Sequence, residues 1–420
     1  MPGKNTPQPA PRFPSTSDLS GRRIGPEELE AVTRVLGSGA LCRTVGTEAA
    51  GLEEEFARMI GSAHAVASSS GTAALHLAVF AVGLEAGDEV IVPPITDFGT
   101  VAGILAQNGI PVFADVDPVS GCLTAETVVA AITPRTRAVI AVHLFGGAAP
   151  VREIIDAVRP SGIVVIEDCA QAYLTVPDGG DAYAGTIGDI GCFSLQQSKH
   201  ITAGDGGLTI TDDAALARRM TLFADKGWPR DTGERTHLFP GLNYRMTELQ
   251  AAVTRAQLPK LAGVVADRRR SATKAISALA DLPGLHLPTQ PDRHGFWMLP
   301  LVLVPGVLNI GCRDFAAALA ERGVPAIGGY LDMPLHLTPA VRDRAPFGAE
   351  GPPFSVPPAS REIAYREGDA PLAEDMVART LLVIVWNENY IDEHVEHIVQ
   401  AVRAVHDGAL AVADGTAVRT

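Results

Sequence analysis

The chain of 420 residues is long enough for one large α/β domain plus a smaller one, with a core able to enclose a reaction site. Its 34 basic and 48 acidic residues give a net charge of -14, which repels phosphate backbones and excludes nucleic acid as an expected partner. No apolar run approaches the roughly 18 residues of a membrane span, and the five cysteines are widely spaced without a CxxC pair. We therefore expect a cytoplasmic protein with reduced thiols, no membrane association and no bound metal.

The order of the expected elements points to an α/β fold. The first 20 residues are rich in proline and serine and predict a flexible arm. Two helical segments follow from Ile24, and from Ala65 short apolar runs alternate with helical segments as far as IVVIED, which ends at Asp168. This alternation predicts a mostly parallel sheet flanked by helices on both faces. The runs DIGCFSL and GGLTITDD have no long helix between them, which indicates antiparallel pairing and a mixed sheet.

The later part of the chain indicates a second domain. A long amphipathic segment begins near Met246, is interrupted by Pro259, and is expected to lead out of the large domain. The apolar run FWMLPLVLV and two further helical segments then predict a smaller C-terminal α/β domain. We expect the arm at 1–20, the large domain at 21–265, the small domain at 266–410 and a frayed tail at 411–420.

A candidate anion site lies at Ser70, Gly71 and Thr72, which open the helical segment TAALHLAVFAV. Backbone amides at a helix N-terminus, together with a hydroxyl, bind phosphate well. Ordinary capping by a serine explains the same residues without any ligand. The motif GxGxxG is missing after the first strand, where SSSGT stands instead, and this disfavours a nicotinamide cofactor.

Two further positions have complementary chemistry. Asp168 ends an apolar strand, where a carboxylate can hold a proton on a pyridine nitrogen, although an acidic helix cap is an equal alternative. Lys199 follows Ser194 by five residues and precedes a glycine-rich turn. Partial burial would lower the pKa of Lys199 and let its amine condense with an aldehyde, but taken alone an exposed loop lysine is the simpler explanation.

Four ordered motifs, SSSGTAAL, EDCAQA, SLQQSKHITAGDGG and GLNYRMTELQAA, resemble the DegT/DnrJ/StrS family of sugar and cyclitol aminotransferases, over roughly Ile24 to Val405. The resemblance implies a fold-type-I homodimer with shared active sites that transfers an amino group from glutamate or glutamine to a keto sugar or ketocyclitol. The expected route is the biosynthesis of an amino sugar or of an aminocyclitol for an antibiotic. Its cofactor would be pyridoxal 5'-phosphate, held as a Schiff base by Lys199, which then moves the proton between cofactor and substrate carbons.

The same resemblance assigns the remaining cofactor contacts. Asp168 would pair with the ring nitrogen and Gln171 would contact the ring hydroxyl. The phosphate contacts would come from the Ser70, Gly71 and Thr72 segment and from Ser194. Asn243 would reach the phosphate from the neighbouring subunit, and Arg245 would lie close to the substrate.

One position departs from the family pattern. Family members commonly carry an aromatic residue after the threonine of the segment matching PPITDFGT, and its ring stacks on the pyridine; here that residue is Asp97. If the segment is a strand, Phe98 points the other way and does not replace the missing ring. We therefore expect Asp97 to mark a subgroup with a different substrate or a rearranged pocket. Tyr330 and His336, in GGYLDMPLH, are expected on the substrate side.

The pair Lys199 and His200 decides between two reactions, because sugar dehydratases of this family carry histidine in the Schiff-base position. The spacing from Ser194 places Lys199 there, which favours transamination over dehydration or elimination at a sugar. A non-catalytic sensor with the same pocket is a further alternative. His143 is expected to line the cleft without chemistry, and the glycine-rich stretch 178–188 is expected to form a mobile loop over it.

Overall fold

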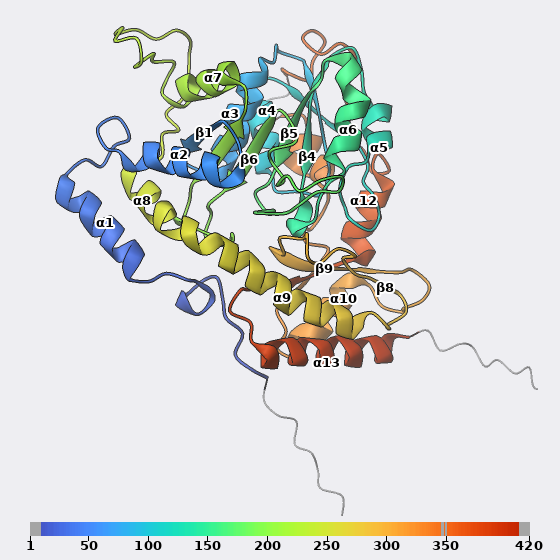
Figure 1. Cartoon of the computed structure of the whole chain (residues 1–420). Helices are drawn as coiled ribbons and strands as arrows, with labels where there is room; N and C mark the ends of the chain where they lie inside the picture. Colours follow the sequence, from blue (N-terminus) through green and yellow to red (C-terminus); the bar gives the residue numbers. More distant parts are fainter. Residues whose placement is uncertain (1–9, 346–347, 349–350, 411–420) are drawn as a thin grey trace, which may run out of the picture.

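A large lobe and a smaller lobe are stacked in the computed structural model, which describes residues 10–345, 348 and 351–410 (Figure 1). The predicted frayed tail at 411–420 lies outside the described residues. None of the described helices is both long and apolar enough to cross a membrane.

The large lobe is built on a seven-stranded sheet in the order β1-β7-β6-β5-β4-β2-β3. Its middle and one edge are parallel, whereas β7 runs antiparallel to both of its neighbours, β1 and β6. The prediction of a mostly parallel, mixed sheet is therefore confirmed. The strands are β1 (His64–Ser68), β2 (Glu89–Val92), β3 (Ile110–Phe113), β4 (Thr136–Val142), β5 (Val164–Asp168), β6 (Ile190–Ser194) and β7 (Gly207–Thr211).

Both faces of this sheet are buried, because successive side chains of a strand point to opposite faces and both sets are apolar. In β4, Val139 and Ala141 join the cluster under α5 and α6, whereas Ala138 and Ile140 join the cluster under α3 and α7. The helices of this lobe are α1 (Pro26–Ser38), α2 (Glu48–Ile60), α3 (Gly71–Val82), α4 (Gly99–Ala106), α5 (Ala125–Ala131), α6 (Val151–Val158), α7 (Ala214–Ala224) and α8 (Glu248–Gln257).

The small lobe has a four-stranded antiparallel sheet in the order β10-β11-β9-β8. Helices α9, α10 and α13 pack on one face of it, around a core that includes Phe315 and Trp386. The elements of this part of the chain are β8 (Leu285–His286), β9 (Met298–Leu303), β10 (Ala326–Gly328), β11 (Leu381–Val385), α9 (Leu261–Leu279), α10 (Cys312–Ala320), α11 (Pro339–Arg342), α12 (Pro371–Asp375) and α13 (Asp392–Ala409).

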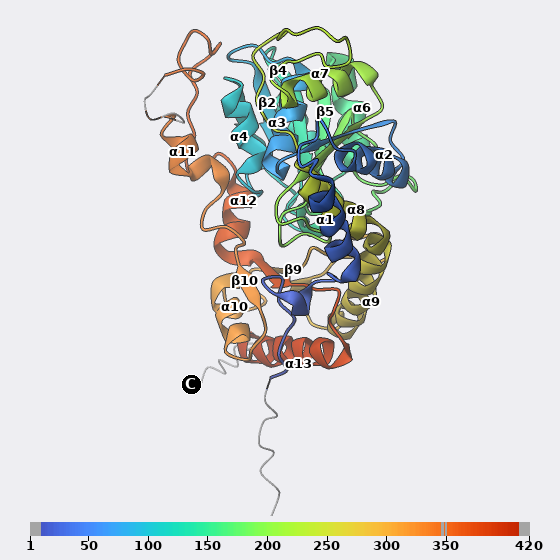
Figure 2. The same ribbon diagram turned by 90° about the vertical axis from the view of Figure 1, so that its left-hand side faces the viewer.

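Two segments do not follow the expected domain division. Residues 351–365 leave the small sheet and pack on the large lobe, where Phe354 and Ile363 bury against Leu105 and Ile110 (Figure 2). Helices α8 and α9 continue into each other through a short turn at Leu258–Lys260, so the expected boundary at residue 265 falls inside α9.

The N-terminal segment is attached to the small lobe from residue 10 onward. Phe13 packs edge-on against Tyr390, with ring centroids 5.3 Å apart, and the Arg12 carbonyl lies 3.2 Å from His394 Nε2. Asn389 Nδ2 donates to the Ser20 carbonyl at 2.8 Å. These contacts hold residues that composition alone had indicated as a flexible arm.

Candidate active site

Asp168 lies at the carboxyl end of β5, the central strand of the large sheet, and is buried. The Thr100 hydroxyl, in the first turn of α4, donates to Oδ2 at 2.9 Å, and the Ala170 N–H donates to Oδ1 at 3.1 Å. Burial raises the pKa of the Asp168 carboxyl, while these two hydrogen bonds and the charge of Lys199 oppose the rise. A buried carboxylate held in this way has room for one more cationic or N–H partner, as a protonated pyridine nitrogen would be.

Lys199 lies in the connection between β6 and β7 and is only 8% exposed. Arg22 Nη1 donates to its carbonyl at 2.6 Å, and its Nζ lies 3.9 Å from the centroid of the Trp297 ring. Burial lowers the pKa of the Lys199 ammonium to about 8, against the opposing charges of Asp168 and Asp97. Near that pH a large share of Lys199 is neutral amine, the form that condenses with an aldehyde.

The end of β6 and the start of α3 meet at Ser194 and Gly71. A Cβ on Gly71 would lie 2.7 Å from the Ser194 Cβ, so only glycine allows this approach. Ser70 does cap α3, because its hydroxyl oxygen accepts the Ala73 N–H at 3.0 Å. The N–H groups of Gly71 and Thr72 have no intrahelical acceptor at this helix end. The four residues predicted to contact a phosphate therefore adjoin one helix N-terminus, as such a site requires.

Gln171 and Tyr330 form a hydrogen-bonded pair next to these groups. Gln171 Oε1 accepts the Phe145 N–H at 2.7 Å, and Nε2 donates to the Tyr330 hydroxyl oxygen at 3.3 Å. Burial and the charges of Asp97 and Asp168 raise the pKa of Tyr330, which therefore stays a phenol that can donate. Gln171, the predicted contact of the ring hydroxyl, and Tyr330, a predicted substrate contact, are thus neighbours.

Asp97 and Phe98 lie in a turn that leads directly into α4, so the strand assumed for them from the sequence is wrong. The Gly99 N–H donates to Asp97 Oδ1 at 2.8 Å, and Phe98 has helical dihedrals of φ -59° and ψ -22°. Both residues are exposed, and the charge of Asp97 acts on the pKa values of Lys199 and Asp168. Asp97 therefore belongs to the site, and the opposite-face argument against stacking by Phe98 no longer applies.

Arg245 and Asn243 lie at a different hollow of the same chain. Arg245 forms an ion pair with Asp225, whose backbone bridges to that of Asn243, and Arg245 lines a cavity of about 330 Å³ beside Trp228. Lys199 and Asp168 do not line this cavity. Asn243 is exposed, so its predicted contact with the phosphate of a neighbouring subunit stays a prediction.

His336 is enclosed rather than open to a substrate. Its Nε2 lies 3.0 Å from Glu374 Oε1, and its ring packs near Phe113, with centroids 5.7 Å apart. In this structure the residue therefore links the segment around α12 to β3, and its predicted substrate contact stays untested.

His143 is fully buried, so the expectation that it lines the cleft is wrong. Its Nε2 lies 2.9 Å from Glu167 Oε2, which also accepts the Gly185 N–H at 2.8 Å. Glu167 Oε1 accepts the N–H groups of Ile187 and Gly188 at 2.8 and 2.6 Å. Although burial opposes ionisation, these hydrogen bonds hold the pKa of Glu167 below its usual value. The stretch predicted as a mobile loop is therefore anchored at residues 185–188.

Three neighbours of the catalytic pair were missed by the sequence reasoning. Thr100 stands three residues after Asp97, in the segment PPITDFGT that was already singled out. Because residues three apart on a helix lie on the same side, this spacing could have indicated that Thr100 belongs to the same site as Asp97. Trp297 lies in the apolar run FWMLPLVLV, and Arg22 in SGRRIG, neither of which carries a recognisable pattern. Both reach Lys199 only through the folding of distant segments.

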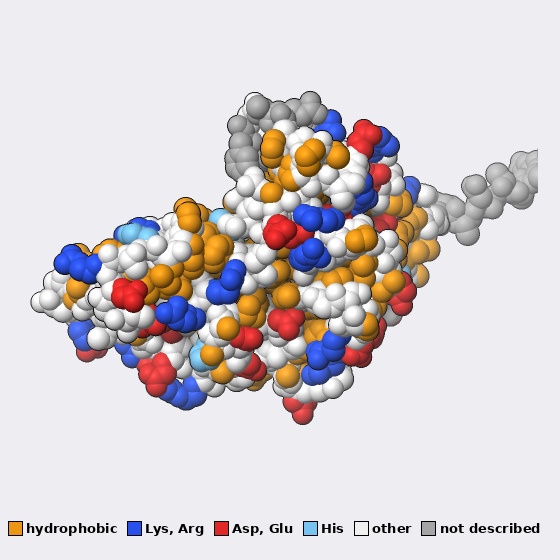
Figure 3. Space-filling view, turned by 90° about the horizontal axis from the view of Figure 1, so that it is seen from above, with side chains coloured by type: hydrophobic (Ala, Val, Ile, Leu, Met, Phe, Trp, Pro, Cys, Tyr) orange, Lys and Arg blue, Asp and Glu red, His pale blue; other side chains and the backbone are white. Residues whose placement is uncertain are grey.

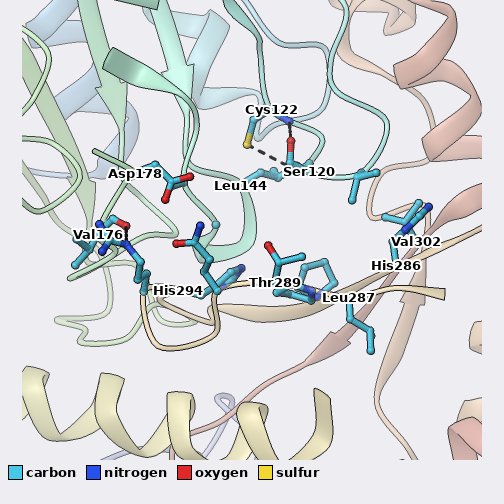
Figure 4. A pocket seen from close by; sticks show the side chains of 17 residues that line it. Ser120, Cys122, Leu144, Val176, Asp178, His286, Leu287, Thr289, His294 and Val302 are labelled. Atoms are coloured by element: carbon cyan, nitrogen blue, oxygen red, sulfur yellow. Dashed lines mark hydrogen bonds between the residues drawn. The ribbon is translucent and has the colours of Figure 1, made fainter. Parts of the chain in front are cut away.

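A further hollow of about 210 Å³ opens between β8, β9 and the loops of the large lobe, and Figure 4 shows its lining side chains. Lys199 and Asp168 are not among them, and the Arg293 guanidinium is already bonded to the carbonyls of Val176, Pro177 and Gly180. This hollow is therefore separate from the catalytic pair.

The residues around Lys199 fit pyridoxal phosphate on three counts: an amine with a lowered pKa, a buried carboxylate at the carboxyl end of the central strand, and a helix N-terminus that glycine brings against Ser194. On this sheet topology they define the class of fold-type-I transferases that depend on this cofactor. Residues 22–363 match the DegT/DnrJ/EryC1/StrS aminotransferase family, and the chain belongs to this family.

Individual relatives agree with this assignment. The L-glutamine:2-deoxy-scyllo-inosose aminotransferase of Streptomyces kanamyceticus is 38% identical over 351 residues, which cover 77% of this chain and 80% of that protein. The spore coat polysaccharide biosynthesis protein SpsC of Bacillus subtilis is 31% identical over 92% of this chain and 96% of its own length. An aminotransferase structure from Psychrobacter cryohalolentis has a TM-score of 0.81 and 28% identity, over 96% of this chain and all of that chain. The protein is therefore an aminotransferase.

Proposed function

We propose that the enzyme transfers the amino group of glutamine or glutamate to a keto cyclitol or keto sugar, in the biosynthesis of an amino sugar or of an aminocyclitol for an antibiotic. It acts as a cytoplasmic homodimer in which Lys199 holds the cofactor covalently. One observation carries the proposal. The buried Lys199 amine lies in the electrostatic reach of the buried Asp168 carboxylate, at the carboxyl end of the central strand. The relative from Streptomyces kanamyceticus supports glutamine as donor and a cyclitol as acceptor.

Each residue has a distinct task in this proposal. The bound cofactor supplies an electron sink for the carbon that carries the amino group. Asp168, oriented by Thr100, keeps a proton on the pyridine nitrogen. The Lys199 amine, once displaced by the donor, takes a proton from one carbon and returns it to another. The amides at the start of α3 would hold the phosphate, and Gln171, itself held by the Phe145 N–H, would contact the ring hydroxyl.

His200 favours transamination over dehydration. Its Nε2 lies 2.8 Å from the Gly295 carbonyl oxygen, and its ring is buried. Burial lowers the pKa of His200 well below its usual value, so the imidazole is neutral. Its hydrogen bond with Gly295 occupies Nε2, and Lys199 rather than His200 acts electrostatically on Asp168, which favours the lysine as the reactive group.

A shared active site is supported by the surface near Asn243. Leu242, which directly precedes Asn243, is 43% exposed, and Leu238 is 52% exposed. Large apolar side chains exposed next to a predicted cross-subunit contact are typical of an interface. On the face shown in Figure 3, basic and acidic side chains are interspersed rather than separated, which is unlike a nucleic-acid surface.

The test begins with the two donors. The holoenzyme is incubated with glutamine, glutamate or, as a control, glycine, and the cofactor absorbance is followed for conversion to the amine form. A keto cyclitol or a nucleotide-linked keto sugar is then added, and the aminated product is measured against donor consumed. Stoichiometric amination supports the proposal. If neither donor changes the spectrum, or if the sugar loses water without any consumption of donor, the proposal is wrong.

Borohydride reduction tests the lysine separately. Reduction of the holoenzyme fixes the cofactor to a peptide that contains Lys199, and Lys199→Ala abolishes this mass shift. Lys226→Ala, a change at a lysine of the loop after α7, is the matched control and retains it. A reduced cofactor found on another lysine would exclude the assignment.

A further inference from the structure

Trp297 comes from the small lobe and directly precedes β9, yet it covers the reactive lysine of the large lobe. The Lys199 Nζ lies 3.9 Å from the centroid of the Trp297 ring, and the Trp297 Nε1 donates to the Ser198 carbonyl at 2.9 Å. One indole thus contacts both the backbone next to the lysine and the amine itself. At 7% exposure, the ring is shielded from water, where a cation over an aromatic face is held most strongly.

The position of the Trp297 ring is set by buried contacts behind it. The Arg268 guanidinium, which is fully buried, donates to the Trp297 carbonyl at 3.1 Å and to the Phe296 carbonyl at 2.9 Å. The same guanidinium pairs with Glu388 at 2.7 Å. Tyr330 packs edge-on against the ring, with centroids 6.2 Å apart. The indole is therefore a fixed wall of the site.

The charges around Lys199 make this wall important. Among the described residues no carboxylate lies within ion-pair distance of the Nζ, so the ring is its nearest stabilising partner. The negative charges of Asp168 and Asp97 favour the Lys199 ammonium from further away, while the buried, neutral His200 contributes no charge. The charged or titratable groups around the lysine are Asp97 before α4, Asp168 at the end of β5, Arg22 on its carbonyl and His200 next in the chain, with Tyr330 against the Trp297 ring.

We propose that the indole face of Trp297 is where the Lys199 ammonium rests whenever its amine is not bonded to the cofactor, which makes Trp297 a further catalytic residue. This inference rests on the proposed function, in which the amine is released in each half-reaction. Burial alone favours neutral amine, whereas the ring stabilises only the protonated form. Trp297 thereby raises the proton affinity of the released lysine, and no bond to the ring forms or breaks.

The experiment measures the protonation of Lys199 without relying on turnover. The holoenzyme is loaded with pyridoxamine phosphate, which leaves the lysine amine free whichever donor is correct. Trace acetic anhydride is then applied across a pH series, and acetylation of the Lys199 peptide is measured by mass spectrometry. Lys274 on α9, which pairs with Asp392 and Glu396, is the internal reference. Because only neutral amine reacts, the midpoint of the rate profile reports the pKa.

The proposal predicts a graded series. Trp297→Leu removes the aromatic face while keeping an apolar side chain, and lowers the Lys199 midpoint by about one pH unit. Trp297→Phe keeps a weaker face and lowers it by less. Trp228→Leu, a change at a tryptophan that lines the other cavity, leaves the Lys199 midpoint unchanged. Fluorinated tryptophans, which weaken the ring face while keeping its shape and its N–H, lower the midpoint with each added fluorine and serve where Trp297→Leu does not fold.

Two results would overturn the inference: a Lys199 midpoint that does not move across the fluorinated series, or equal shifts in Trp297→Phe and Trp297→Leu. Failure of the proposed function looks different. If the proposed function is wrong, borohydride does not fix the cofactor to Lys199, or neither glutamine nor glutamate converts the cofactor to its amine form. Both results are independent of the acetylation profile.

Discussion

Replacing Thr100 by valine removes a single hydroxyl from beneath the cofactor site at nearly constant volume. Thr100 is completely buried, and its hydroxyl donates to Asp168 Oδ2 at 2.9 Å. Since that hydroxyl has one hydrogen, the 2.8 Å bond between Thr96 and Thr100 must have Thr96 as donor while Asp168 is ionised. Thr100→Val therefore removes one of the two hydrogen bonds to the Asp168 carboxylate and also leaves the Thr96 hydroxyl without its acceptor.

The magnitude follows from the burial of both groups. A hydrogen bond to a charged group contributes about 1.5–3 kcal/mol, and no water has room to replace this one. Since 1.36 kcal/mol corresponds to one pKa unit, the pKa of Asp168 should rise by about one to two units above its already raised value. A carboxyl that is protonated more often holds less charge against the ring nitrogen. We expect kcat/KM to fall by about 10- to 100-fold.

The assay compares Thr100→Val with Thr100→Ser, which keeps the hydroxyl and removes only the methyl group. Kinetics of the donor half-reaction are measured against pH, together with urea unfolding to separate the stability cost. The activity deficit of Thr100→Val relative to wild type should be larger on the acidic side and smaller on the alkaline side, because the Asp168 carboxyl of the variant needs a higher pH to ionise. Equal activity of the valine variant and wild type, or an equal loss in the serine variant, would refute the hydrogen-bond argument.

Three further outcomes are expected. Gly71→Ala places a Cβ against Ser194 and should weaken cofactor binding by about tenfold in a titration. The control is Gly37→Ala on α1, where the added Cβ meets nothing within 4 Å and should stabilise the fold slightly. The rate of covalent cofactor capture by the apoenzyme should rise with pH through about 8 and then level off, because the neutral Lys199 amine reacts; a flat profile would contradict the burial of this lysine. Glu248→Ala should lower the free energy of unfolding by about 1–3 kcal/mol, because two N–H groups at the start of α2 lose a buried acceptor; Glu248→Gln should cost less in the same urea titration.

The alternating elements and the place of Asp168 at the end of β5 could be predicted because their signals are local. A buried parallel strand such as β5 is a continuous apolar run, and Asp168 stands at its end in the sequence as in the fold. The antiparallel β7 was predicted from the missing crossover helix. Only the resemblance favoured Lys199 over an exposed loop lysine, because the sequence around it does not reveal that it is buried, as the structure shows.

The contacts that were missed join segments far apart in the chain. Arg22 and Lys199 are separated by 177 residues, and no local pattern links them. Trp297 looked like the start of an apolar strand, and its actual role depends on how the small lobe meets the large one. The turn at Asp97 was misread because strand geometry was assumed for Asp97 and Phe98, which lie between the end of β2 at Val92 and the start of α4 at Gly99.

Helices α8 and α9 form one nearly continuous helical rod that connects the two lobes (Figure 1). Its weakest point is the 3-10 turn at Leu258–Lys260, where Pro259 lacks the N–H that would continue the helical ladder. A swinging motion of the small lobe must bend this rod at the turn or break its packing against α13. Such a motion would also move Trp297, which comes from the small lobe, relative to Lys199 of the large lobe.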